Sequence, residues 1–477
     1  MMRRTKIVCT LGPASLRRET LVAMLRAGMD VARLNTSHGT IDQHLEAVKL
    51  VRQVAAEERR PVAVLMDLGG PKLRTGMMAN GIAVDLAVGD AIRLTPKPVE
   101  GTKELIHVEC PGLTEDVRAG DRVLIDDGKI ELEVTHVDAG GLDTRVLVGG
   151  VLGSRKGVSF PHSTLTAPAV TGRDEEYLRA GIEAGVDFFA LSFVRDANDI
   201  ERARSIMAEQ NADIPIIAKI ERRQAVENLE AIVAEADGVM VARGDLGVEL
   251  PPEDVPVLQR KIIQAAATKM IPVITATQML ESMIDSPRPT RAESSDVANA
   301  VWDLSDALML SGETAAGRYP VESVAMMDRI IRKAESAMPP DGDRLVRAEN
   351  DDHSYVVALA ARRIVESDEN MTGIVCFTRS GYTAFLMSKV HANAPVYAMT
   401  PHEGVWRRLS LARGVVPVLA PLVESSEQML HTVDKLMVEE QHLKSGEEVV
   451  VVASLPVQAK GTTNFLKLHR LGESSAY

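Results

Sequence analysis

Short runs of apolar and β-branched residues recur over the first two thirds of the chain, and each is followed by a stretch with helical spacing. Such runs are typical of parallel strands that are buried on both faces. In the stretch 252–270, Val257, Ile262, Ile263 and Ala266 are expected near one face of a helix. Eight strand–helix units form a (β/α)₈ or TIM barrel. The predicted strands are residues 6–11, 30–34, 62–68, 188–193, 214–220, 238–242, 272–277 and 307–310.

Residues 70–167 interrupt the repeat after the third predicted strand. They contain short strand-like runs, such as 91–94 and 122–125, which are separated by turn signals such as Asp127-Gly128. We interpret this segment as a small inserted β-barrel domain that can act as a lid. The catalytic barrel would then comprise residues 1–69 and 168–338.

A polar stretch at 339–343, with the sequence PPDGD, reads as a linker after the barrel. Strand and helix patterns alternate again beyond it, which predicts a C-terminal α/β domain of doubly wound type at 339–477. Its predicted strands are residues 373–378, 395–400, 415–419 and 448–454.

Composition narrows the class of protein. The 477 residues suffice for about three domains of ordinary size, and 45% apolar with 25% charged residues is typical of a soluble globular chain. The net charge of -13 argues against a general nucleic-acid surface, although small anions could bind in local basic pockets. The cysteines Cys9, Cys110 and Cys376 are far apart and form no Cys-x-x-Cys motif, so neither a disulfide framework nor a thiolate zinc site is indicated.

The N-terminal residues run directly into a predicted strand, without the apolar region of a signal peptide. No apolar run approaches the roughly 20 residues that span a bilayer. We therefore expect a cytoplasmic protein with no membrane partner, and a reducing compartment fits the cysteines.

Polar and charged side chains follow the predicted barrel strands one after another. Strand C-termini meet at one mouth of a barrel, so these side chains would converge there. Any one of them could be a helix cap or a hydrogen-bonded rim residue, and for Ser192 or Ser311 alone that is the first interpretation. Their joint placement favours an active site. The set is Arg33, Asn35, Ser37, Asp67, Ser192, Lys219, Glu221, Asp245, Thr277 and Ser311.

Eight stretches, taken together and in order, resemble pyruvate kinases. Each motif alone could match by chance, but together they span the predicted barrel from end to end. They are residues 5–15 (TKIVCTLGPAS), 32–39 (ARLNTSHG), 66–76 (MDLGGPKLRTG), 216–221 (IIAKIE), 240–249 (MVARGDLGVE), 276–283 (ATQMLESM), 286–293 (SPRPTRAE) and 310–315 (LSGETA).

The resemblance implies transfer of the phosphoryl group of phosphoenolpyruvate to ADP, which gives ATP and pyruvate through an enolate. Two polyanions must meet, so such a site needs cations more than a nucleophile. Glu221 and Asp245 match the carboxylates that hold Mg²⁺ or Mn²⁺. Lys219 matches the ligand of the moving phosphoryl group, and Arg33 matches a phosphate-binding arginine.

The resemblance also assigns the remaining substrate contacts. The backbone N–H groups of Gly244 and Asp245 are expected to receive the substrate carboxylate, with Ser192 and Ser311 nearby. Thr277 matches a proton relay to the enolate, for which a water chain is an equal alternative. The residues assigned to the nucleotide are Arg74, which bridges both substrates, and Asn35, His38, Asp127 and Lys156, the last two in the lid.

This chain has Lys72 at a position where many members of the family have glutamate. Those members need K⁺ beside the phosphates. In those relatives the positions matching Asn35, Ser37, Asp67 and Leu68 hold the ion. An ammonium carries the same charge as K⁺, so Lys72 could replace it and K⁺ would not be required. Leu68-Gly69, where potassium-dependent relatives often have Thr-Lys, points the same way. The alternative is that Lys72 faces solvent and K⁺ still binds.

The loop at 378–383 lies between a predicted strand and a predicted helix, which is a common place for an anion. In the family it matches the phosphate loop of an allosteric pocket, although a capped helix start without a ligand is the alternative. A sugar bisphosphate, a sugar monophosphate and AMP all fit, and the resemblance also implies a homotetramer. The predicted effector contacts are Thr378, Arg379, Ser380, Gly381 and Thr383.

Two other functions remain open from the residues themselves. Lys219, Glu221 and Asp245 would also serve a metal-dependent lyase or aldolase that stabilises a pyruvate enolate, but that chemistry would not need Arg74, the lid or Lys156. A non-catalytic regulator that binds nucleotide or sugar phosphate is expected to have lost Lys219 or a metal carboxylate, and this chain retains them.

Overall fold

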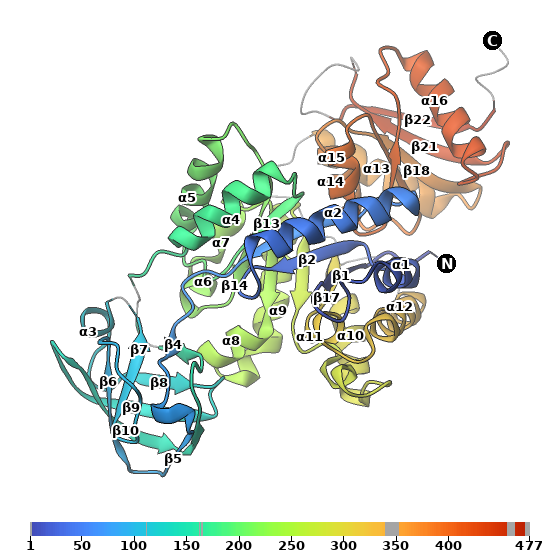
Figure 1. Ribbon diagram of the computed structural model, residues 1–477. Coiled ribbons are helices and arrows are strands. Elements are labelled where there is room, and N and C mark those ends of the chain that lie inside the picture. Colours follow the sequence, from blue (N-terminus) through green and yellow to red (C-terminus); the bar gives the residue numbers. More distant parts are fainter. Residues whose placement is uncertain are drawn as a thin grey trace.

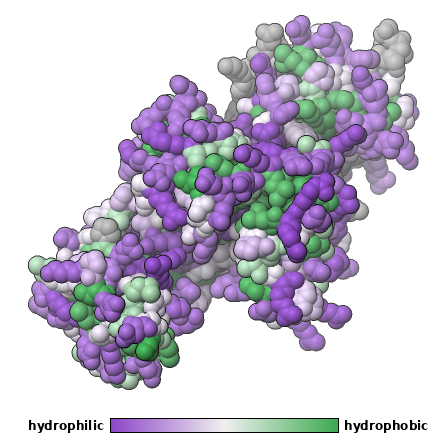
Figure 2. Space-filling view, in the orientation of Figure 1, coloured by the Kyte–Doolittle hydropathy of each residue, from purple (hydrophilic) through white to green (hydrophobic). Residues whose placement is uncertain are grey.

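The computed structural model describes residues 2–110, 112–161, 163, 166–338, 353–455 and 463–472. The linker predicted at 339–343 lies outside these residues. Figure 1 shows a central barrel with a β-rich lobe at one end and an α/β lobe at the other. In Figure 2 the β-rich lobe is joined to the barrel by a narrower waist.

The central lobe is a closed barrel of eight parallel strands, as predicted. Strand β17 pairs with β1, which closes the ring. Phe193 was predicted inside the fourth strand but follows it, because its φ of 56° ends the extended conformation. The strands are β1 (Lys6–Thr10), β2 (Val31–Asn35), β3 (Ala63–Leu68), β13 (Phe188–Leu191), β14 (Ile216–Ile220), β15 (Gly238–Ala242), β16 (Val273–Ala276) and β17 (Ala307–Leu310).

Helices surround the barrel, and three of the longer ones start with threonine capping boxes, at Thr40, Thr171 and Thr290. The longer helices are α1 (Arg18–Ala27), α2 (Ile41–Glu57), α4 (Gly172–Glu183), α5 (Ala197–Ala208), α9 (Val255–Thr268), α10 (Arg291–Trp302) and α12 (Pro320–Ser336). Shorter helices follow the later strands, namely α6 (Arg223–Glu227), α7 (Leu229–Glu235), α8 (Arg243–Glu249) and α11 (Gly312–Ala315).

The predicted apolar face of α9 needs one correction. Ile262, Ile263 and Ala266 are buried, but Val257 is 68% exposed. At about 100° per residue, Val257 lies on the side of the helix opposite Ala266. The prediction was wrong because it counted an apolar residue without its angle.

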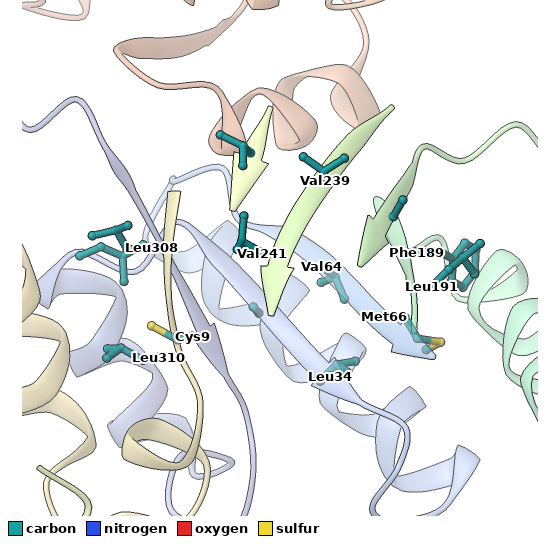
Figure 3. Close-up of a cluster of buried hydrophobic side chains, with 14 of the residues drawn as sticks. Cys9, Leu34, Val64, Met66, Phe189, Leu191, Val239, Val241, Leu308 and Leu310 are labelled. Carbon is teal, nitrogen blue, oxygen red and sulfur yellow. The ribbon is translucent and has the colours of Figure 1, made fainter. Parts of the chain in front are cut away.

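Side chains alternate between two layers along each barrel strand. One layer packs between strands and helices, and Figure 3 shows members of it, including Leu34, Met66 and Val241. The other layer fills the barrel interior and includes Val31, Leu65 and Ile217. The period of two therefore decides which residue at each strand end faces the barrel axis.

The β-rich lobe has its own apolar core. Its seven-stranded sheet has the order β12-β8-β9-β10-β6-β7-β4, and a bridge between Arg74 and Gly157 brings its two edges together. The strands are β4 (Arg74–Thr75), β6 (Ala91–Thr95), β7 (Leu105–Glu109), β8 (Arg122–Ile125), β9 (Ile130–Asp138), β10 (Gly141–Val148) and β12 (Val158–Ser159), with β5 (Val84–Leu86) and β11 (Gly150–Leu152) paired beside them.

The C-terminal lobe is a five-stranded sheet in the order β20-β19-β18-β21-β22. Four strands are parallel and were predicted, whereas the antiparallel edge strand β22 was not. The strands are β18 (Met371–Phe377), β19 (Val396–Thr400), β20 (Val415–Leu419), β21 (Glu448–Ala453) and β22 (Phe465–Arg470); the helices are α13 (His353–Ser367), α14 (Tyr382–Lys389), α15 (Glu403–Arg408) and α16 (Ser426–Glu439).

The C-terminal lobe packs on the end of the barrel where the strands begin. Leu411 joins the apolar cluster of the barrel interior. Lys389 forms a buried ion pair with Asp306, which directly precedes β17. Asp187 pairs with Arg52 of the barrel at 2.7 Å and with Arg407 of the C-terminal lobe at 2.9 Å. These contacts leave the other barrel mouth to the lid.

No helix among the described residues is long and apolar enough to cross a membrane.

Candidate active site

The barrel alternation explains why the polar residues converge. In β2 and β3, the interior positions Val31 and Leu65 are followed two residues later by Arg33 and Asp67. In β14, the interior position Ile217 is followed by Lys219 and then Glu221. Apolar residues therefore fill the interior layers, and charged residues replace them at the C-terminal mouth.

Lys219 lies at the centre of this cluster and is almost fully buried. Its Nζ lies 2.8 Å from Glu221 Oε1 and 3.2 Å from Asp67 Oδ1, and it donates a hydrogen bond to Ser192 Oγ at 2.7 Å. Burial by itself lowers the pKa of Lys219, but the charges of Asp67 and Glu221 outweigh burial and raise it. Lys219 is therefore a fixed ammonium, suited to stabilising negative charge.

Arg33 is held on the other side of Asp67. Its Nε donates to Asp67 Oδ2 at 2.7 Å, and its Nη1 donates to Thr10 Oγ1 at 2.8 Å. Burial raises the pKa of Asp67, but Lys219 and Arg33 outweigh burial and lower it. Both oxygens of one buried carboxylate thus hold two cations in place.

Glu221 and Asp245 place two carboxylates at the barrel mouth. Glu221 is buried, and its Oε2 accepts from the N–H of Phe193 at 2.8 Å. Asp245 lines the cleft between the lobes at the start of α8. Partial desolvation inside this cleft, and then the negative charge of Glu221, raise the pKa of Asp245 to about 6. Two carboxylates that repel each other at one mouth fit a hard cation whose other ligands come from substrate and water. No group of three or more His, Cys, Asp or Glu side chains forms a metal site in the described part of the chain.

The structure places Thr277 against Gly244. The N–H of Gly244 donates to Thr277 Oγ1 at 2.8 Å, and that hydroxyl donates to the carbonyl of Ala276 at 2.7 Å. Thr277 has a φ of 65°, and Arg243 stabilises it by donating to its carbonyl at 2.6 Å. Ser311 lines a pocket at the barrel mouth together with Gly244 and Thr277, and its buried Oγ has no partner among the described residues.

A cleft of about 580 Å³ separates the lid from the barrel mouth. Lys72, Arg74, Lys156 and Asp127 line it, as does Asp245. Lys156 is held by Asp126, with its Nζ 3.0 Å from Oδ1. The lid cations therefore face the same space as Asp245.

Lys72 is exposed, but it faces the cleft. Burial and the charge of Lys219 lower its pKa, while Asp245, Glu221 and Asp67 act in the opposite direction. No ion pair of its ammonium is formed with the described residues. Lys72 therefore adds a positive charge to this cleft.

The other residues predicted for nucleotide and K⁺ lie at the end of β2, in the loop after it and at the end of β3. Asn35 Oδ1 accepts from the N–H of Ser37 at 3.2 Å. The pKa of His38 is lowered by burial and then by Lys72 and Arg74, so His38 lies in their positive field. Leu68 is buried at the end of β3, where only its backbone could contact an ion.

The predicted effector loop lines a second pocket, of about 540 Å³, in the C-terminal lobe. Thr378 Oγ1 accepts from the N–H of Gly381 at 2.9 Å, and Gly381 has a φ of 99°. Thr383 Oγ1 lies 3.0 Å from Thr463 Oγ1. Arg379 and Ser380 are exposed at the pocket. Thr378 therefore shapes the loop, whereas Ser380 and Arg379 are available to a ligand.

Sequence reasoning missed several residues of the site. Thr10 orients Arg33, Phe193 donates to Glu221, and Asp126 holds Lys156. Thr10 could have been found, because it continues the interior alternation of β1 after Val8. Phe193 and Asp126 act from left-handed backbone conformations, which the residue types do not indicate.

Fold and site define a class, namely a TIM-barrel enzyme with a lid and a mouth lined by cations and two metal-type carboxylates. The chain belongs to the pyruvate kinase family. Residues 2–324 match the barrel domain of pyruvate kinase, and residues 356–469 match its alpha/beta domain.

Individual relatives agree with this assignment. The chain is 44% identical to a pyruvate kinase of Mycobacterium tuberculosis over 475 residues, which cover 99% of each chain. It is also 44% identical to a pyruvate kinase of Geobacillus stearothermophilus, over 99% of this chain and 81% of that one. A crystal structure of a pyruvate kinase from Cryptosporidium parvum matches with a TM-score of 0.92 at 35% identity, covering 98% of this chain and 96% of that chain.

Proposed function

We propose that the protein transfers the phosphoryl group of phosphoenolpyruvate to ADP and so produces ATP and pyruvate. The observation that carries this proposal is the buried array in which Asp67 holds Arg33 and Lys219 side by side at the barrel mouth. Two fixed cations there suit the charge that develops on a phosphoryl group in transfer. Family membership supports the same reaction.

The proposed reaction follows from these positions. A β-phosphate oxygen of ADP attacks phosphorus, the bond from phosphorus to the enol oxygen breaks, and that oxygen keeps the electron pair. Lys219 and Arg33 stabilise the moving phosphoryl group, and Lys219 also stabilises the enolate oxygen. A proton delivered at the Thr277 side then converts the enolate to pyruvate.

Glu221 and Asp245 would hold the divalent cation, Mg²⁺ or Mn²⁺. When bound, this ion supplies positive charge against the phosphate and enolate oxygens. The N–H groups at the start of α8, those of Gly244 and Asp245, are proposed to receive the substrate carboxylate, with Ser192 and Ser311 nearby. Because Thr277 accepts from Gly244 in this structure, substrate binding would displace or share that hydrogen bond.

On the nucleotide side, Arg74 is proposed to bridge both substrates. Asn35 and His38 would contact ADP from the barrel. Lys156 and Asp127 would approach from the lid as it closes, and Lys156 would exchange Asp126 for phosphate.

Transfer is tested by ³¹P NMR of purified enzyme with phosphoenolpyruvate, ADP and Mg²⁺. A β,γ-linked product must appear as the phosphoenolpyruvate signal disappears, whereas release of inorganic phosphate alone would exclude the proposal.

We propose further that Lys72 replaces a bound K⁺. Lys72 lines the same cleft as Arg74 and Asp245, which supports a position near the proposed phosphate contacts. Both oxygens of Asp67, which would contact K⁺ in potassium-dependent relatives, already bind Arg33 and Lys219. A second monovalent cation would therefore find both oxygens of Asp67 occupied and would be repelled by Arg33 and Lys219.

Lys72→Glu should create a potassium requirement. We expect wild-type turnover to change less than about twofold when 100 mM Na⁺ replaces K⁺, while Lys72→Glu loses roughly tenfold or more in Na⁺ and regains activity in K⁺. The measurement is steady-state ATP formation at constant ionic strength. Lys261→Glu, on the exposed side of α9, is the control for the charge change. Strong K⁺ activation of the wild type would contradict the replacement.

We propose that the loop 378–383 binds the phosphate of an allosteric effector and that the enzyme works as a regulated homotetramer. The loop opens on a pocket that carries Arg379 and the Ser380 hydroxyl, and it leads into α14 at Gly381. Anions are stabilised at such a helix start.

Ser380→Ala should remove effector binding. In thermal-shift assays with a sugar bisphosphate, a sugar monophosphate and AMP, we expect at least one compound to raise the wild-type Tm by a few degrees at saturation. The shift should be lost in Ser380→Ala and in Thr378→Ala/Ser380→Ala/Thr383→Ala, and it should persist in the control Ser367→Ala at the end of α13. An equal shift in the loop variants would exclude this pocket.

A further inference from the structure

Arg222 is a buried cation that the proposed reaction does not use. Arg222 directly follows Glu221 and precedes α6, and it is 8% exposed. Its buried Nε has no hydrogen-bond partner, and its side chain forms no ion pair within the described ranges. A buried charge without a partner is costly, so a position of this kind indicates a ligand that the protein alone does not provide.

The position of Arg222 is fixed by Phe193. The guanidinium carbon lies 4.9 Å from the centroid of the Phe193 ring. Phe193 in turn donates its N–H to Glu221 and packs against Gly70, where an added Cβ would approach the ring within 2.9 Å. A cation held on an aromatic face keeps its N–H edge free for an acceptor. The guanidinium of Arg222 is therefore held in position by an aromatic ring, and its positive charge is not neutralised by a carboxylate among the described residues.

Arg222 lines the cleft between barrel and lid, together with Arg223. The Nε of Arg223 is likewise buried without a partner in the described structure. Across the cleft, the lid contributes Arg155 and Lys156. Glu249 also lines this space. Burial raises the pKa of Glu249, and the positive charge of Arg222 acts in the opposite direction. The two side chains form no ion pair in the described structure. Cations from both walls thus face one cavity.

We propose that Arg222 and Arg223 form a second anion subsite that takes a phosphate dianion, distinct from the phosphoryl position at Arg33 and Lys219. The planar guanidinium fork matches two phosphate oxygens, and Lys156 can approach the same anion from the lid. Free phosphate and a phosphate group of the nucleotide present the same chemistry. A phosphate held by both walls favours the closed lid.

The test is isothermal titration of inorganic phosphate into the full-length enzyme at constant ionic strength, without substrates. An Arg33→Gln background weakens the substrate phosphate position, so that the second subsite is measured by itself. We expect Arg33→Gln to bind phosphate and Arg33→Gln/Arg222→Gln to lose roughly tenfold or more in affinity, with Arg222→Lys between them. Arg202→Gln, which removes an exposed pair with Glu175, is the matched control.

Titration of Mg²⁺-ADP distinguishes the two sources of phosphate. A weaker ADP affinity in Arg222→Gln assigns the subsite to the nucleotide, and an unchanged one assigns it to free phosphate. Equal affinities of Arg33→Gln and Arg33→Gln/Arg222→Gln for phosphate would overturn the proposal, as would absence of phosphate binding to Arg33→Gln. Binding requires no turnover, so this result is independent of the proposed reaction.

Discussion

Lys219→Met is expected to lower kcat by about 10³-fold or more, which is the range for removing a cation that stabilises phosphoryl transfer. Lys219 is the only residue whose ammonium contacts Asp67, Glu221 and Ser192 in the described structure. Methionine nearly fills its volume but supplies no charge to the phosphoryl group or the enolate. The measurement is ATP formation at saturating phosphoenolpyruvate, ADP and Mg²⁺.

The loss should fall on kcat rather than on KM alone, because the interaction strengthens as charge develops in the transition state. Lys6→Met is the control. Lys6 is also a buried barrel lysine, but it lies at the start of β1, at the end of the barrel away from the mouth. It donates to the carbonyl of Val415 at 2.8 Å. Its kcat should stay within a fewfold of the wild type. Equal activity of Lys219→Met and Lys6→Met would remove Lys219 from the mechanism.

Lys389→Met is expected to reduce the free energy of unfolding by about 3–5 kcal/mol, the usual cost of removing one partner of a buried ion pair. Asp306 would keep the Val273 N–H as a donor at 2.7 Å, and its Oδ1 has no hydrogen-bond partner among the described residues. The pair joins the C-terminal lobe to the start of β17, so its loss should also weaken docking of that lobe.

Urea unfolding followed by circular dichroism measures this effect. Arg179→Ala is the matched control, because its pair with Glu209 is exposed on both sides and should contribute less than about 1 kcal/mol. The double variant Lys389→Met/Asp306→Asn should recover part of the loss, since no uncompensated charge remains buried. A Lys389→Met midpoint equal to that of Arg179→Ala would contradict a stabilising role for the pair.

The barrel could be predicted because its strands are apolar on both faces and are separated by helices of regular spacing. The eight predicted strands differ from the observed ones by at most two residues at either end. Strand β22 was not predicted, because it lies at a sheet edge and mixes apolar and basic residues over Phe465–Arg470. Edge strands carry a weaker pattern than strands buried on both faces.

The site residues that could be predicted are those that follow the alternation of side chains along the barrel strands. Arg33, Asp67 and Lys219 continue the interior-facing positions of their strands, so topology brings them together. Their pairing could not be read from the sequence, because it depends on the register between β2, β3, β13 and β14. Arg222 was missed for another reason. Its burial, its contact with the Phe193 ring and the lack of a hydrogen-bond partner for its Nε among the described residues depend on the folded structure.

We propose that phosphoryl transfer from phosphoenolpyruvate to ADP takes place at the barrel mouth formed by Lys219, Glu221 and Asp245. The most direct measurement is ATP formation by purified enzyme with both substrates, with Mg²⁺ and with a chelator. We expect ATP and pyruvate in equal amounts with Mg²⁺, and loss of both with the chelator or in Glu221→Gln. Pyruvate formed without ATP, or ATP formation that is unchanged by the chelator, would contradict it.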